Sequence, residues 1–133
     1  MSVNEYLHPY SCFVQPQPPP APLINVSDSY DLPKAFIMDD PDANGFVHWV
    51  AYNIPGNVQQ LPSNLATDGK NSRGQVGFTP FCPPAGTGVH HYRFRIFLLD
   101  PTTPLLPKNL TAEQVLAALQ PYIWHINAAP AVF

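Results

Sequence analysis

Short runs of hydrophobic residues, each closed by a turn-forming sequence, follow one another along most of the chain. Residues 34–38 are such a run and end at Asp39-Asp40-Pro41-Asp42, so we predict a buried strand there. Residues 47–54 form a second strand candidate, which a Pro-Gly pair ends, and residues 90–99 form the longest one. This succession indicates a mostly β protein.

One segment near the C-terminus has the pattern of a helix. Thr111 and Gln114 have the spacing of a capping box, in which each side chain bonds the other residue's backbone N–H. Pro121 should end or kink this helix, because proline has no N–H to donate. Residues 122–133 are predicted to form a second helical turn and a final extended piece. The apolar stripe of the helix consists of Val115, Leu116 and Leu119.

The length and the proline content indicate a single domain rich in turns. The 133 residues fit one domain, 1–133, and 45% of them are hydrophobic, enough for one core. The 18 prolines argue against long helices, and segments 56–75 and 82–88 are predicted to be loops. Residues 1–22 end in a proline cluster and are predicted to form a rigid N-terminal arm over the domain.

The charge pattern excludes several classes of partner. The net charge is −3 with only six Lys and Arg, so there is no basic stripe for nucleic acid. No apolar run approaches the roughly 20 residues of a transmembrane helix. Residues 1–10 do not have the pattern of a secretory signal, so we expect a cytoplasmic protein. The low charge and the high apolar content are compatible with a homodimer.

Two strand candidates carry polar residues that could meet. Alternate residues of a strand share a face, so His90 and Tyr92 lie on the apolar face of their strand. By the same alternation, His48 should share a face with Val50, Tyr52 and Ile54, with Trp49 on the opposite face. If the two strands bring their starts together, two imidazoles and a phenol meet at a rim built from loops.

These groups suit the binding of a small anion. Imidazole N–H and tyrosine O–H groups match the oxygens of phosphate, sulfate or carboxylate. Asp40 or Asp42 could accept from the far ring nitrogen of a histidine and fix its tautomer, so that the near nitrogen donates. Pro83 and Pro84 would add a rigid apolar wall. Taken singly, each residue could equally belong to an ordinary turn or a buried structural contact.

The same segments resemble the two motifs of the phosphatidylethanolamine-binding family, which includes Raf kinase inhibitor proteins and small bacterial members. The first motif is similar to Asp40-Pro41-Asp42-Ala43 followed by His48-Trp49. The second is similar to residues 83–94, with their proline pair, glycines, His90 and Tyr92. Both motifs occur in the order and spacing that the family has.

The resemblance implies a β-sandwich of antiparallel sheets with one or two C-terminal helices. It also implies a non-catalytic binding protein without a cofactor, whose pocket takes a phosphate-like ligand or a phospholipid headgroup, and which could regulate a protein partner. The pocket would be lined by Asp40, Asp42, His48, Cys82, Pro83, Pro84, His90 and Tyr92.

Two departures from the family pattern lie beside the predicted pocket. Asn44 stands where the first motif has its last proline, and we expect this change to loosen the turn. His91 stands where the second motif has an arginine, which removes a fixed charge from the outer face of the strand.

Three other functions are compatible with parts of the sequence. The protein could inhibit a kinase or a protease through its surface. Cys82 with a histidine and an aspartate could form a hydrolase, although Pro83 offers no amide as an oxyanion donor immediately after it. Asp40, Asp42, His48 and His90 could hold a metal ion, but no paired ligand motif supports a site. We predict neither catalytic residues nor a metal.

Overall fold

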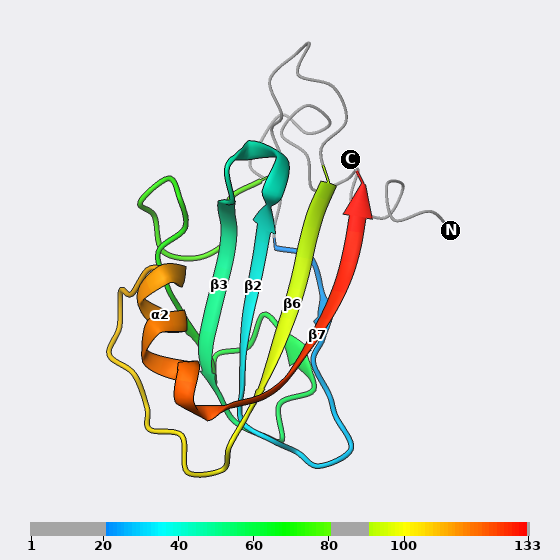
Figure 1. The fold of residues 1–133 in the computed structure, drawn as a ribbon, viewed down its shortest axis with the longest axis vertical. Coiled ribbons are helices and arrows are strands. Elements are labelled where there is room, and N and C mark those ends of the chain that lie inside the picture. The colour runs from blue at the N-terminus through cyan, green and yellow to red at the C-terminus, as the bar shows by residue number, and fades with distance from the viewer. Residues whose placement is uncertain (1–20, 81–90, 133) are drawn as a thin grey trace.

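A five-stranded antiparallel sheet forms the centre of the protein in the computed structural model, which describes residues 21–80 and 91–132 (Figure 1). Its strand order is β5-β3-β2-β6-β7. The central strand, β2, is paired with β6 along most of its length. The strands are β2 (Lys34–Asp40), β3 (Phe46–Ile54), β5 (Thr67–Asp68), β6 (His91–Leu99) and β7 (Ile123–Val132).

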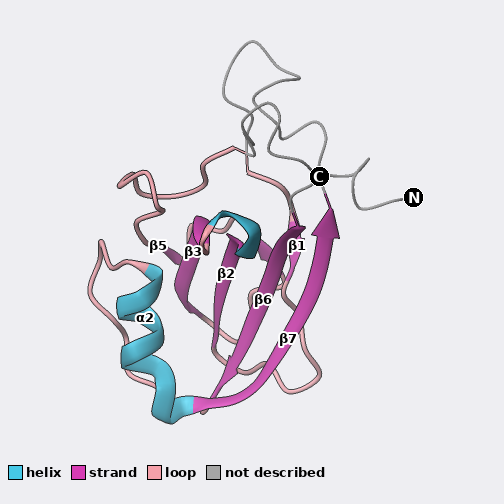
Figure 2. Ribbon diagram, turned by 45° about the horizontal axis from the view of Figure 1, so that its top comes forward, coloured by secondary structure: helices cyan, strands magenta, loops and turns pink. Residues whose placement is uncertain are grey.

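Different elements cover the two faces of this sheet (Figure 2). A small two-stranded sheet, β1 (Ile24–Asn25) with β4 (Gln60–Leu61), packs on the side that we call the strand face. The helix α2 (Ala112–Leu119) packs on the other side, the helix face. Phe36, Met38 and Trp49 belong to the core on the strand face, whereas Ile37 and Val50 belong to the core on the helix face. Covering both faces makes the predicted β-sandwich, in which the second sheet has two strands among the described residues.

Most of the predicted elements are confirmed. The strands at 34–38 and 47–54 are β2 and β3, and β6 fills residues 91–99 of the longest candidate. Segment 56–75 is a loop that contains only the short strands β4 and β5. The loop expected at 82–88 and most of the N-terminal arm lie outside the described residues.

The C-terminal region begins with a capped helix. The Thr111 hydroxyl accepts from the Gln114 N–H at 3.2 Å, and the Gln114 side chain accepts from the Thr111 N–H at 3.0 Å, so the capping box is confirmed. A 3-10 turn, Gln120–Tyr122, follows with Pro121 inside it, and the chain then runs as β7. No described helix has the length and apolar character needed to cross a bilayer.

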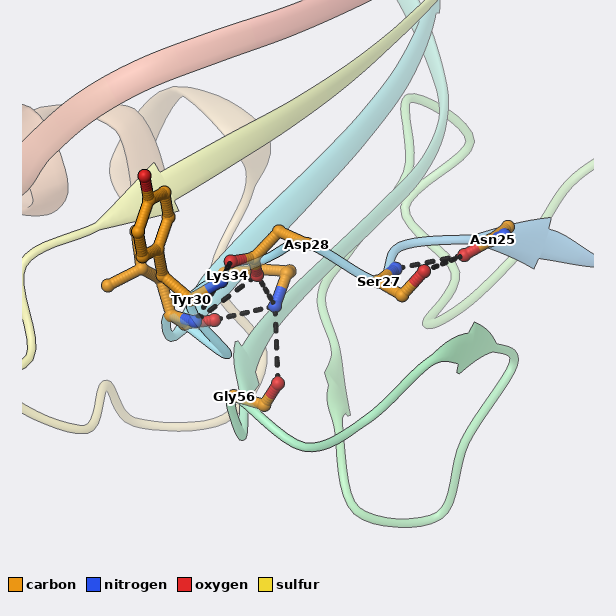
Figure 3. Close-up of polar contacts among 7 residues, drawn as sticks. Asn25, Ser27, Asp28, Tyr30, Lys34 and Gly56 are labelled. Atoms are coloured by element: carbon orange, nitrogen blue, oxygen red, sulfur yellow. Dashed lines mark hydrogen bonds and ion pairs between the residues drawn. The ribbon is translucent and has the colours of Figure 1, made fainter.

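A buried ion pair holds the N-terminal segment against the start of β2 (Figure 3). The Lys34 side chain is fully buried, and its ammonium lies 2.5 Å from the Asp28 carboxylate. It also donates to the carbonyls of Leu32 at 2.7 Å and Gly56 at 3.4 Å. Burial has the largest single effect on the Asp28 carboxyl and raises its pKa. The hydrogen bond and charge of Lys34, with the hydrogen bonds from the Tyr30 and Leu32 N–H groups, together outweigh burial, so the pKa is lowered. This network lies at the end of β2 opposite Asp40.

Candidate functional site

A bulge in β3 determines where His48 lies. Met38 of β2 is opposite Trp49, but the next residue of β2, Asp39, is opposite Val47, so His48 is an extra residue in its strand. The His48 ring packs edge-on against Tyr92 of β6, with ring centroids 5.2 Å apart. Its neighbour Trp49 belongs to the core on the same strand face. The predicted alternation was therefore wrong: His48 does not share a face with Val50 and Tyr52.

A second register shift moves Ile54 in the same way. It lies between the Lys34–Ile54 and Phe36–Ala51 pairs. Asn53, beside it, has a left-handed φ of 53°, a conformation that asparagine tolerates better than most residues. Ile54 thus joins the strand-face core, not the core of Val50.

Asp40 and Tyr92 meet His48 on the strand face. Asp40 follows Phe36 and Met38 by strict alternation along β2, and it is buried at the end of the strand. Tyr92 is buried on the strand-face core, as predicted for the apolar face of its strand. The negative charge of Asp40 acts on both His48 and Tyr92. Three of the predicted site residues therefore form one group, which we call the Asp40–His48–Tyr92 cluster.

Thr79 determines the tautomer of His48. The Nδ1 atom of His48 lies 3.0 Å from the Thr79 carbonyl oxygen. A carbonyl can only accept, so Nδ1 carries a proton and donates it. The charge of the ring then changes by protonation at Nε2. At His48 a backbone carbonyl, and not a carboxylate, thus accepts from Nδ1.

Burial and charge act in opposite directions on the pKa of His48. Burial lowers the pKa below its ordinary value, because the cationic ring loses hydration. The Thr79 carbonyl and the Asp40 carboxylate favour the cation, but they do not outweigh burial. The imidazole is therefore predominantly neutral at pH 7. A bound anion would add to the effect of Asp40 and favour the protonated ring.

Tyr92 stays a hydrogen-bonding phenol at every physiological pH. Burial raises the pKa of its hydroxyl far above the ordinary value, and the Asp40 carboxylate raises it further. A neutral phenol retains its O–H, so it can donate to an anion. Tyr92 can therefore donate without a change of charge, whereas His48 must first be protonated at Nε2 because Nδ1 is engaged with Thr79.

Asp42 connects the turn after β2 to the start of β6. Its carboxylate accepts from the His91 backbone N–H at 2.7 Å and lies 2.8 Å from the His91 ring Nδ1. The Asp40 side chain accepts from the Asp42 N–H at 2.9 Å and caps the 3-10 turn Pro41–Ala43. The histidine at the position of the family's arginine thus has a specific partner: Asp42, which we expected beside a histidine of the pocket, lies beside His91.

Asn44 gives this turn a definite conformation. It ends the 3-10 turn with a left-handed φ of 55°, and Gly45 continues with a φ of 75°. Proline cannot adopt a positive φ, whereas asparagine does so at low cost. The replacement that we expected to loosen the turn therefore suits a different and well-defined turn.

A charged group that was not predicted from the sequence lies on the helix face, on the opposite side of the sheet from the cluster. The buried Asp39 carboxylate accepts from Arg93 at 2.7 and 3.1 Å and from Arg95 at 3.1 Å. The hydrogen bond that Arg93 donates to Asp39 raises the pKa of Arg93, whereas burial lowers that of Arg95. Strand alternation separates Asp39 from Asp40, so the two carboxylates face opposite sides of the sheet.

The remaining predicted site residues cannot be compared with this geometry. Cys82, Pro83, Pro84 and His90 lie outside the described residues. Within residues 21–80 and 91–132, no three His, Cys, Asp or Glu side chains are close enough together to hold a metal ion. The roles of all eight predicted residues in ligand binding stay predictions.

The family model described as phosphatidylethanolamine-binding protein matches residues 19–129, which include both motifs. The chain belongs to the phosphatidylethanolamine-binding protein family.

Several curated relatives of this chain come from archaea and bacteria. A UPF0098 protein of Pyrococcus horikoshii is 36% identical over 118 residues, which are 78% of this chain and 59% of that protein. A UPF0098 protein of Pyrococcus abyssi is 38% identical over 100 residues, 65% of this chain and 55% of that protein. A Mycobacterium tuberculosis protein named as a lipoprotein, LppC, is 41% identical over 91 residues, 64% of this chain and 45% of that protein. The chain thus spans about half the length of these relatives.

Solved structures of the family have the same fold. A phosphatidylethanolamine-binding protein homologue of Chlamydia trachomatis superposes with a TM-score of 0.79 at 26% identity, covering 93% of this chain and 85% of its own. YbcL of Escherichia coli, described as a member of the mammalian family, superposes with a TM-score of 0.72 at 26% identity, covering 85% and 79%. The predicted mostly β fold and family resemblance are both confirmed.

Proposed function

We propose that this protein is a non-catalytic binding protein whose Asp40–His48–Tyr92 cluster takes part in a pocket for a small phosphate-like anion or a phospholipid headgroup. The observation that supports this most is the convergence of His48 and Tyr92, two buried hydrogen-bonding side chains from different strands, with ring centroids 5.2 Å apart. Family membership supports a binding role. Cys82, Pro83, Pro84 and His90 complete the pocket in the sequence prediction.

The two rings suit an anion because of what each can donate. The Tyr92 hydroxyl donates in its neutral form. His48 donates from Nε2 only when that nitrogen is protonated, since Nδ1 is engaged with Thr79. A phosphate oxygen beside Nε2 would therefore be bound together with a proton. Hydrogen bonds to charged acceptors contribute about 1.5–3 kcal/mol, enough for a millimolar or tighter site built from a few of them.

The buried Asp40 carboxylate can support anion binding only indirectly, through its effect on the charge of His48. Asp40 would repel a phosphate, but its charge also favours the His48 imidazolium that an anion needs. A ligand that carries an ammonium group as well as a phosphate would reduce this repulsion. We therefore propose that phosphoethanolamine binds more tightly than inorganic phosphate.

Isothermal titration of the full chain tests this proposal. Inorganic phosphate and phosphoethanolamine are titrated against the wild-type protein, His48→Ala and Tyr92→Phe at constant ionic strength. We expect saturable binding to the wild type, a loss of affinity of roughly tenfold or more in His48→Ala, and a smaller loss in Tyr92→Phe.

A matched control separates the cluster from a general effect of the substitutions. Tyr30 is 82% exposed and lies at the opposite end of β2, so Tyr30→Phe should bind as the wild type does. Binding that is unchanged in both cluster variants, with circular dichroism showing a native fold, would exclude the cluster as the anion site. Absence of binding to the wild type at millimolar ligand would exclude the proposed function itself.

Regulation of a protein partner, including inhibition of a kinase or a protease, is a second part of the proposed function. It depends on outer surfaces and on residues 1–22 rather than on the cluster. Pull-down with and without residues 1–22 tests it: a partner lost on truncation would assign the interaction to the arm. The cytoplasmic location and the absence of turnover also stay predictions, and incubation with phosphate esters tests the latter.

A further inference from the structure

The segment 71–79 is hydrogen-bonded to the start of β3 near both of its ends. The Ser72 N–H donates to the Val47 carbonyl at 2.9 Å, and the Ser72 hydroxyl accepts from the Val47 N–H at 2.7 Å. The Thr79 N–H donates to the His48 carbonyl at 2.8 Å, in addition to the contact of the Thr79 carbonyl with the His48 ring. Figure 1 shows this segment in green beside the start of β3. The loop between these contacts therefore begins and ends at the backbone that carries His48.

A buried asparagine gives this loop a definite conformation. Asn71 is only 4% exposed, and its side-chain oxygen accepts from the N–H groups of Arg73 at 2.9 Å and Gln75 at 3.3 Å. The side-chain amide of Asn71 donates to the Gly77 carbonyl at 2.8 Å. The backbone of Arg73 is therefore held in place, and only its side chain has to be ordered when a ligand binds.

Arg73 is an exposed cation whose charge reaches the cluster. Within the described part of the chain, no ion pair includes its guanidinium, which is thus available to a ligand. Asp40 and Arg73 both act electrostatically on His48, and they do so in opposite directions. The contacts of the loop with β3 account for this effect, because they keep Arg73 close to the strand position of His48.

The charges around the cluster determine which phosphate compounds suit it. Asp40 is negatively charged, whereas His48 and Tyr92 are predominantly neutral at pH 7, so the cluster itself has no fixed positive charge. A phosphate monoester has a charge of about −2 at pH 7.5, because its second pKa is about 6. A phosphodiester, such as the headgroup of an intact phospholipid, has a charge of about −1 on its phosphate. The second charge of a monoester therefore requires a cation from outside the cluster.

We propose that Arg73 binds the phosphate group of the ligand from the loop side and makes the pocket selective for phosphate monoesters over phosphodiesters. This inference rests on the proposed anion-binding function of the cluster. A guanidinium binds two oxygens of one phosphate through parallel N–H donors, and it keeps its charge at every physiological pH. A monoester has three terminal oxygens to share among His48, Tyr92 and Arg73, whereas a diester has only two. Arg73 therefore strengthens the binding of a monoester more than that of a diester.

Isothermal titration of the full 133-residue chain at pH 7.5 and constant ionic strength tests the proposal with two ligands that carry the same ammonium group. Phosphoethanolamine is a monoester, and glycerophosphoethanolamine is the corresponding diester. The wild type should bind the monoester at least about fivefold more tightly than the diester. Arg73→Gln should weaken the monoester about five- to tenfold and the diester no more than about twofold, so that the preference disappears. Arg73→Lys keeps the charge without the paired donors and should retain part of the preference.

A control variant separates a local role of Arg73 from a general effect of charge. Lys108 is exposed in the segment before α2, next to Pro107, whose carbonyl contacts Tyr52 of the helix-face core, so Lys108→Gln should keep the wild-type preference. Equal affinity of the wild type for both compounds, a preference that persists in Arg73→Gln, or an equal loss in Lys108→Gln would each overturn this inference and leave the anion site standing. Absence of binding of both compounds to the wild type would exclude the proposed function and this inference together.

Discussion

His48 shows how a single side chain acquires its chemistry from neighbours that are distant in sequence. The sequence motif indicates a histidine at this position, but the carbonyl of Thr79 determines its tautomer. Burial lowers the pKa of the ring, and the charge of Asp40 opposes that effect. The sequence predicted that the residue would face an anion. It could not predict the Thr79 contact, since a backbone carbonyl is present at every position and leaves no signature.

The depressed pKa of His48 predicts a specific dependence of stability on pH. The unfolded chain has the ordinary value of 6.5, and the folded chain has a lower one. The unfolded state therefore binds more protons between these values, and the free energy of unfolding should fall as the pH drops through 6.5 towards the folded pKa. Urea unfolding at about pH 7.5 and 5.5 measures this in the wild type and in His48→Gln. An equal fall in both proteins would show that His48 does not contribute.

The Lys34–Asp28 pair gives a second prediction at this scale. Lys34→Met leaves a buried carboxylate without its cation and should lower the free energy of unfolding by about 3 kcal/mol. The double variant Lys34→Met/Asp28→Asn removes the charge and keeps an oxygen for the Tyr30 N–H, so it should recover about 1 kcal/mol or more. Urea unfolding of the three proteins checks this. A double variant that is less stable than Lys34→Met would contradict it.

Lys34 also shows a limit of prediction from composition. The residue begins an apolar run, and lysine at the start of a strand is ordinarily exposed. Its burial depends on Asp28 and on two loop carbonyls, of Leu32 and Gly56, that reach it only in the folded chain. No periodicity in the sequence brings these groups together.

At the scale of elements, strand existence could be predicted well and strand register could not. β2, β3 and β6 follow from their apolar runs and turn sequences, and α2 follows from its capping box. The bulge at His48 does not, because a register shift is a property of two paired strands and alternation within β3 contains no sign of it. The site depends on this bulge, which places His48 beside Tyr92.

The capping box of α2 is the element whose contribution is easiest to isolate. Thr111→Ala removes the hydroxyl that accepts from the Gln114 N–H, and it should lower the free energy of unfolding by about 1 kcal/mol. Thr111→Ser keeps the hydroxyl and should be close to the wild type. Chemical denaturation of the pair measures the difference, and equal losses in Ala and Ser would mean that the methyl group matters and the cap does not.

At the scale of the whole molecule, the sheet separates three polar regions. The Asp40–His48–Tyr92 cluster lies on the strand face at one end of β2, the Asp39–Arg93–Arg95 group lies on the helix face, and the Lys34–Asp28 pair lies at the other end of β2.

The most direct test of the anion site is the pH titration of the His48 ring protons by NMR, with and without phosphoethanolamine and against a matched chloride control. If the ligand lies beside Nε2, the midpoint of His48 should move to higher pH in its presence and stay unchanged with chloride, because a bound anion favours the imidazolium. A His48 midpoint that does not respond to phosphoethanolamine at millimolar concentration would contradict an anion pocket at this cluster.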